Sequence, residues 1–115
     1  MFTTPSGRRI WLYAQPTDMR KSFRGLIALV RHHLHEVPTS GAYFVFINRR
    51  KTQMKILYFE SSGYCLWSKR LEQGQFNYPQ NAPGKLALDA AGLQWLIEGI
   101  KVEKFRRYKR YSHAA

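Results

Sequence analysis

The chain has 115 residues and a formal net charge of +12, from 19 Lys and Arg against 7 Asp and Glu. This length suits one domain with its own core and is marginal for two. A charge of this size repels itself in a compact state, so we expect an anionic partner, and nucleic acid rather than acidic lipid. The sequence has no apolar run near the ~20 residues of a spanning helix, no signal-peptide core and no cysteine pair, which predicts a cytoplasmic protein with neither a membrane partner nor a disulfide.

The first third of the chain predicts a strand followed by a helix. Residues 10–13 (IWLY) are a short apolar run that Pro16 stops, which favours a strand at a sheet edge. In residues 17–36 apolar side chains recur at helical spacing, and Asp18 or Thr17 can cap the start of this helix. The expected buried stripe consists of Met19, Phe23, Leu26, Ile27, Val30 and Leu34.

Residues 42–71 predict a β-meander of three strands. The segments 42–48 (AYFVFIN) and 54–60 (MKILYFE) are apolar runs of strand-forming residues, typical of strands covered on both faces. The third strand, 64–71, is aromatic at one end and basic at the other. Residues 49–53 form the first turn, and Gly63 can take the positive φ that the second turn needs.

The remainder predicts a second helix and a tail. Residues 75–78 are a candidate short strand, and Asp89 can cap a helix over 90–98 that Gly99 ends. The fold class is therefore α+β, a small antiparallel β-meander sheet with two packed helices and a basic C-terminal tail. We expect one domain over residues 1–100 and a basic aromatic tail over 101–115 that can become helical on a partner.

Four groups of cations are candidate phosphate contacts. Arg20 and Lys21 are expected in the first turn of the helix, where a phosphate would meet free N–H groups and the helix dipole; the alternative is that both side chains point into water. Strand alternation places Lys69 and Arg70 on opposite faces of their strand. The tail mixes cations with aromatic rings, which suits phosphates and stacked bases. The candidate DNA-binding residues are Arg20, Lys21, Arg49, Arg50, Lys51, Lys69, Arg70, Lys104, Arg106, Arg107, Lys109 and Arg110.

Catalysis has little support in the sequence. The carboxylates are scattered or suit helix caps, whereas two-metal nucleases need several that converge. The histidines at 32, 33 and 35 lack the spacing of four that puts two metal ligands on one helix face. Cys65, within an apolar strand, suits a small buried hydrophobe. We therefore expect no catalytic residues, no metal and no cofactor, while a metal-free ribonuclease that uses Arg, Lys, His and Tyr stays an alternative.

Three strings in this order carry a family resemblance: DMRKSFRGLIALV (18–30), GAYFVFINRRKTQMKILYFE (41–60) and GYCLWSKRLEQGQF (63–76). Together they resemble the TnpB accessory proteins, the second open reading frame of bacterial insertion sequences of type 66, which are distinct from the RNA-guided nucleases that share the name. The resemblance covers roughly residues 9–100. The chain departs from the family pattern at Arg24, where relatives often have an acidic residue, and at 59–62, where a tryptophan and an acidic turn are more typical.

This resemblance implies a protein encoded beside a separate transposase and needed for efficient transposition, without a recognised catalytic centre. With the charge, it favours a non-catalytic factor that binds duplex DNA through phosphate contacts and works with the transposase and other proteins of the same element. The alternatives are a protein adaptor without direct DNA contact and a small RNA-binding or ribonuclease module. The oligomeric state is left open by the sequence.

Overall fold

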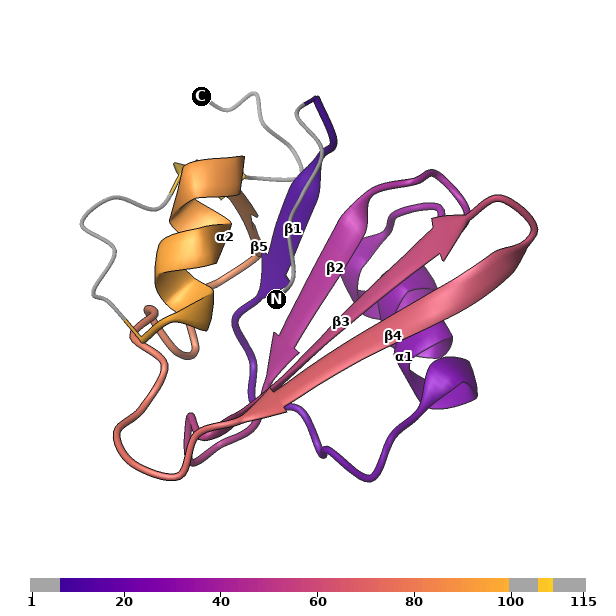
Figure 1. Ribbon diagram of the computed structural model, residues 1–115. Helices are drawn as coiled ribbons and strands as arrows, with labels where there is room; N and C mark the ends of the chain where they lie inside the picture. The colour runs from indigo at the N-terminus through magenta and orange to yellow at the C-terminus, as the bar shows by residue number, and fades with distance from the viewer. Residues whose placement is uncertain (1–6, 100–105, 109–115) are drawn as a thin grey trace.

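Figure 1 shows the computed structural model, which describes residues 7–99 and 106–108. One mixed sheet has the strand order β4-β3-β2-β1-β5-β6, in which β1 and β2 are parallel and the other neighbours antiparallel. The small α+β fold and the meander β2–β3–β4 confirm the sequence prediction. The strands are β1 (Ile10–Tyr13), β2 (Tyr43–Ile47), β3 (Gln53–Glu60), β4 (Gly63–Arg70), β5 (Lys85–Leu88) and β6 (Arg106–Tyr108).

The first strand lies inside the sheet, so its expected place at an edge is wrong. It pairs with β2 on one side and with β5 on the other. Trp11 and Leu12 point to opposite faces and are both buried, as a central strand requires. Pro16 lies beyond the last paired residue, Tyr13, so it costs the sheet no hydrogen bond.

The first helix, α1 (Phe23–Leu29), is shorter than predicted and continues as a π-helical turn, η1 (Val30–Leu34). Its start is not capped by Asp18 or Thr17. The residue at the N-cap is Ser22, and its side chain makes no capping hydrogen bond. Thr17 instead donates its N–H to the carbonyl of Ile47 at 2.9 Å, which ties this segment to the end of β2.

Two apolar layers cover the sheet, and the helices lie on opposite faces (Figure 1). On one face α1 and η1 bury Leu26, Val30 and Leu34 against the sheet. Phe23, expected in this stripe, is 42% exposed because it is the first residue of a helix that starts later than predicted. The sheet residues of this layer are Trp11, Phe44, Phe46 and Leu57.

On the other face, α2 (Ala90–Ile97) packs Leu93, Leu96 and Ile97 against the sheet. Its predicted cap is confirmed, since Asp89 Oδ1 accepts the N–H of Gly92 at 2.7 Å. Gly99 takes the expected left-handed conformation, with φ of 83°.

Two local predictions near the meander are wrong. Residues 75–78 form no strand, although Phe76 and Tyr78 are buried beneath the α2 face. In the second turn the positive φ belongs to Ser61, at 60°, and not to Gly63. Because Gly63 already pairs with Glu60, the turn has only two residues and its first one takes the left-handed conformation.

Three residues of the predicted tail belong to the sheet. Residues 106–108 form β6, paired with 85–87 of β5, rather than part of a helix. The predicted domain boundary at residue 100 lies outside the described residues, and it stays a prediction.

Candidate nucleic-acid interface

A surface depression of about 680 Å³ lies where the chain leaves β2 and β1 at one end of the sheet. We call it the cationic groove. It brings Arg20 together with Arg49 and Arg50, which the sequence analysis placed in separate groups. Its lining consists of Pro16, Thr17, Asp18, Met19, Arg20, Asn48, Arg49, Arg50 and Gln53.

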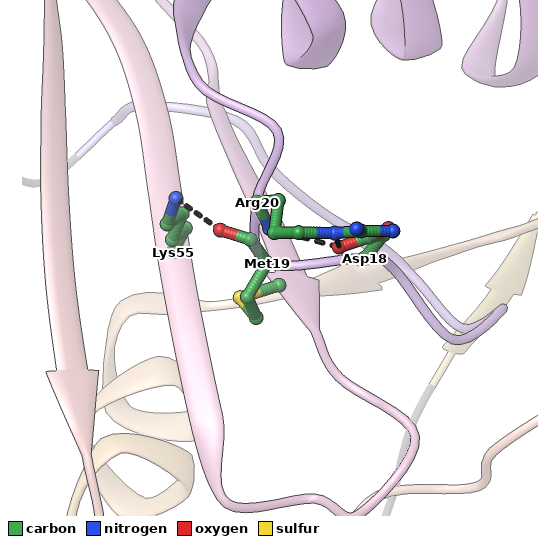
Figure 2. A network of polar contacts seen from close by, with 4 residues as sticks. All are labelled: Asp18, Met19, Arg20 and Lys55. Carbon is green, nitrogen blue, oxygen red and sulfur yellow. Dashed lines mark hydrogen bonds and ion pairs between the residues drawn. The ribbon is translucent and has the colours of Figure 1, made fainter.

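An ion pair between Asp18 and Arg20, drawn in Figure 2, contributes to the lining of the groove. Arg20 Nη2 donates to Asp18 Oδ2 at 2.6 Å, and Arg20 Nε lies 3.1 Å from both carboxylate oxygens. The hydrogen bonds from the Arg20 side chain hold the pKa of the Asp18 carboxyl well below its usual range. Asp18 is therefore ionised at neutral pH, and it orients a guanidinium that is 91% exposed. Such an exposed pair contributes little to stability, so its main effect is on the charge of the groove.

The backbone beneath Arg20 is fixed from β3. Lys55 Nζ donates to the carbonyls of Met19 and Lys21, at 2.7 Å each, as Figure 2 shows for Met19. Sequence reasoning did not single out Lys55. The available signal was a lone cation within the apolar run 54–60, because such a side chain must find acceptors when its strand is covered.

The expected placement of Arg20 and Lys21 in the first turn of the helix is wrong, while their role as phosphate contacts stays a prediction. Arg20 and Lys21 precede α1, which begins at Phe23, so they do not lie in its first turn. The side chain of Lys21 lies over Gly25, where an added Cβ would stand 3.1 Å from its Cγ. The two cations therefore diverge, and Arg20 alone lines the groove.

The hairpin tip, residues 48–52, also contributes to the lining of the groove. Asn48 Oδ1 accepts the N–H groups of Thr52 and Gln53, at 2.8 and 3.0 Å, and closes the turn from within. Lys51 takes a φ of 63°, and its Nζ lies 5.8 Å from the ring centroid of Tyr78. Arg49 and Arg50, between these two residues, remain exposed.

A loop in which the sequence predicted a short strand, and no functional role, holds this tip in place. We call residues 71–80 the bracing loop. Four tip carbonyls in succession accept hydrogen bonds from it: those of 49 and 50 from the Gln80 and Gln75 side chains, and those of 51 and 52 from the N–H groups of Phe76 and Leu71. Gln80 also donates to the hydroxyl of Tyr78 at 2.8 Å. The two arginines are thus carried on a backbone whose acceptors are already satisfied.

The remaining predicted cations lie elsewhere. Lys69 Nζ donates to the carbonyl of Ile97 at 2.9 Å, at the end of α2, so its amine serves the fold. Arg70 Nε lies 3.8 Å from Glu72 Oε2 at the exposed end of β4. Arg106 and Arg107 belong to β6. Lys104, Lys109 and Arg110 lie outside the described residues.

Within residues 7–99 and 106–108 no three His, Cys, Asp or Glu side chains gather as a metal site would require. No helix in the same part of the chain has both the length and the apolar character needed to cross a membrane.

Comparison with known proteins decides the family. The profile of the family described as "IS66 Orf2 like protein" matches residues 8–107. The chain belongs to this family. Its members are the accessory TnpB proteins of IS66-type insertion sequences, so the resemblance found in the sequence is confirmed.

Two relatives come from Sinorhizobium fredii. The uncharacterized protein y4hO is 37% identical over 98 residues, which cover 84% of this chain and 85% of the relative. The uncharacterized protein y4jC is 34% identical over 101 residues, which cover 88% of this chain and 86% of the relative. No solved structure matches the chain.

Proposed function

We propose that this IS66 TnpB protein is a non-catalytic accessory factor of transposition that binds duplex DNA through its phosphates and assists the separate transposase of its element. One observation supports this most: three arginines from two distant segments line one groove, on backbone that Lys55 and the bracing loop hold in place. Guanidinium groups form short, paired hydrogen bonds to phosphate oxygens, so this arrangement suits a sugar-phosphate backbone.

The distribution of lysine and arginine supports the same proposal. Lys55, Lys69 and Lys85 direct their amines at backbone carbonyls within the fold. Lys85 also pairs with Glu36. The exposed cations of the groove are instead arginines, which pair with phosphate in two-point geometry. Three exposed arginines therefore gather at the hairpin end of the sheet, while other exposed cations, such as Arg24 and Arg31, lie elsewhere.

The groove suits positioning on DNA more than base readout. Base readout usually takes a helix or ribbon that offers Arg, Asn or Gln at repeated spacing. Here Arg49 and Arg50 are adjacent residues on a turn, and Asp18 stands beside Arg20, where it would oppose deep insertion of an anion. We expect contacts that fix the protein on the duplex without specifying its sequence.

An adaptor role toward the transposase is the second candidate, favoured by two exposed aromatic side chains. Trp95 on α2 is 48% exposed and Phe23 on α1 is 42% exposed, on opposite faces of the sheet. Exposed aromatics are common anchors of protein interfaces. This role can accompany DNA binding or replace it.

A salt titration separates these roles. The affinity of the full chain is measured for duplex DNA, single-stranded DNA and RNA between low and physiological salt. Where a protein contacts phosphates, the logarithm of its affinity falls linearly with the logarithm of the salt concentration. On a duplex the slope becomes steeper by about 0.9 for each phosphate that is neutralised. We expect Arg49→Ala with Arg50→Ala and Lys51→Ala to flatten this slope and to weaken binding to unrelated duplexes by similar factors.

A control removes two exposed cations elsewhere, with Arg24→Ala and Arg31→Ala. This variant should change the slope less for each charge removed. Loss of preference for the element's ends with general affinity retained would make the tip a reader of sequence. Absence of salt-dependent DNA binding would favour the adaptor role, and protein-dependent cleavage of DNA or RNA would contradict a non-catalytic factor.

A further inference from the structure

A second surface depression, of about 690 Å³, lies at the end of the sheet opposite the cationic groove. We call it the second depression. The parallel strands β1 and β2 both begin beside it, whereas both end beside the groove. Its lining includes Arg8 and Arg9, which precede β1, and Gly41, which precedes β2. The sequence analysis counted neither arginine among the candidate DNA contacts.

Aromatic rings of the first two strands hold both guanidinium groups. The guanidinium carbon of Arg9 lies 5.6 Å from the ring centroid of Trp11, within the range of cation–π attraction. That of Arg8 lies 5.1 Å from the ring centroid of Tyr43, and Arg8 Nη1 donates to the carbonyl of Gly41 at 2.6 Å. A guanidinium over a ring keeps N–H donors at its edge for another partner. Arg9 is exposed, so its donors are open to solvent.

The positive charge of these two arginines is not neutralised within the fold. Glu36 also lines the second depression, but its carboxylate pairs with the amine of Lys85. This amine donates to the carbonyl of Leu34 as well, at 3.1 Å. In the described part of the chain, neither Arg8 nor Arg9 forms an ion pair. Two fixed cations therefore await an anion from outside the described fold.

The lining of the second depression suits a phosphate group better than an acidic protein surface. The centre of a protein interface is usually apolar. The large apolar side chains that the described residues expose are Phe23, Val37 and Trp95, and none of them lines this depression. A phosphate group needs only positive charge and N–H donors, which two guanidinium groups supply.

We propose that the second depression is a second phosphate site, in which Arg8 and Arg9 bind a phosphate group of duplex DNA. This inference rests on the proposed function, and it adds a contact at the far end of the sheet. Trp11 of this depression and Met19 of the groove pack into the same apolar layer, so both sites lie toward the α1 side. The five residues of β2 lie between them, a rise of ~13 Å.

The test is a salt titration of the full chain with a duplex of about 16 base pairs. Arg9→Ala should flatten the slope of log affinity on log salt by about 0.9, as for loss of one phosphate contact. The matched control is Arg31→Ala, which removes one exposed cation of η1 outside both depressions and should flatten it less. Arg9→Lys keeps the charge but loses the paired donors, so the slope should stay while the affinity falls.

Binding stoichiometry identifies the source of the phosphate. If Arg9→Ala leaves the number of duplexes bound per chain unchanged, one duplex reaches both sites. If this number falls from two to one, the second depression binds a separate duplex. Either result, together with the flatter slope, supports the second site.

Contrary results separate this inference from the proposed function. If changes at the hairpin tip flatten the slope while Arg9→Ala acts no more strongly than Arg31→Ala, the second site is overturned and the groove stands. If the wild-type chain shows no salt-dependent DNA binding, both proposals fall. Thermal unfolding checks that each variant is folded. If Arg9→Ala fails to fold, Arg9→Lys and Arg8→Ala decide, and an unchanged affinity in both would overturn the site.

Discussion

The two turns of the meander differ in how the rest of the chain treats them. The tip between β2 and β3 carries three consecutive cations, and Asn48 closes it from inside while the bracing loop holds four of its carbonyls. The turn between β3 and β4 has two serines, of which Ser61 alone takes a positive φ. A turn that only reverses the chain needs little support, whereas a cationic turn anchored at nearly every residue presents its side chains in fixed positions.

The largest expected effect comes from removing the centre of the bracing loop. Phe76 is fully buried, and its N–H binds the carbonyl of Lys51 at 2.7 Å. Phe76→Ala should lower the free energy of unfolding by roughly 3–5 kcal/mol, because it leaves a cavity beneath α2. Denaturant titration measures this loss. Ser62→Ala in the other turn should stay within about 0.5 kcal/mol, and equal losses would contradict the contrast.

A smaller effect is expected from one amide. Gln80→Ala removes hydrogen bonds to the carbonyls of 48 and 49 and to Tyr78. The free energy of unfolding should fall by about 1–2 kcal/mol, and hydrogen exchange of the tip amides should accelerate. The control is Gln73→Ala, at an exposed position of the same loop. Unchanged exchange at the tip would show that the loop does not hold it.

Moving a charge between the two turns tests placement at constant net charge. Arg49→Ser combined with Ser62→Arg transfers one guanidinium from the braced tip to the simple turn. If DNA lies in the cationic groove, affinity for a duplex should fall about threefold to tenfold, as for loss of one phosphate contact. Fluorescence anisotropy at fixed salt measures it. Equal affinity would mean that net charge alone governs binding.

The smallest effect concerns pH. Burial raises the pKa of Tyr78, so its neutral form is favoured in the folded chain. The unfolded chain ionises first, near pH 10; the stability this group contributes is therefore complete below that value and is lost as pH rises through the folded pKa. The denaturation midpoint should fall from pH 9 to 11, and less steeply in Tyr78→Phe. An identical decline in both proteins would assign it to other groups.

Elements with long apolar runs were predictable from the sequence, and those fixed by tertiary contacts were not. The meander and α2 follow from residues 42–71 and from the Asp89 cap, which act locally. The start of α1 was misplaced because Asp18 bonds Arg20 and Thr17 bonds Ile47 instead of capping a helix. The helical spacing of apolar residues extends back to Met19, but these contacts keep the chain out of the helix until Phe23.

The candidate site was predictable in its residue types but not in its assembly. Clusters of cations at 20–21 and 49–51 are visible in the sequence, but nothing local indicates that Arg20 meets the hairpin tip or that Lys21 turns away. Lys69 was grouped with the DNA contacts because its acceptor, the carbonyl of Ile97, lies on a distant helix. Long side chains choose partners in space, which a linear pattern does not record.

The central place of β1 has a consequence for the protein's synthesis. This strand leaves the ribosome first among the described strands, but one of its two neighbours, β5, ends only at Leu88. At ~5–20 residues per second, the nascent chain carries Trp11 and Leu12 for several seconds with one flank uncovered. A message truncated before β5 would leave this apolar strand permanently open, so incomplete translation products should be insoluble or rapidly degraded.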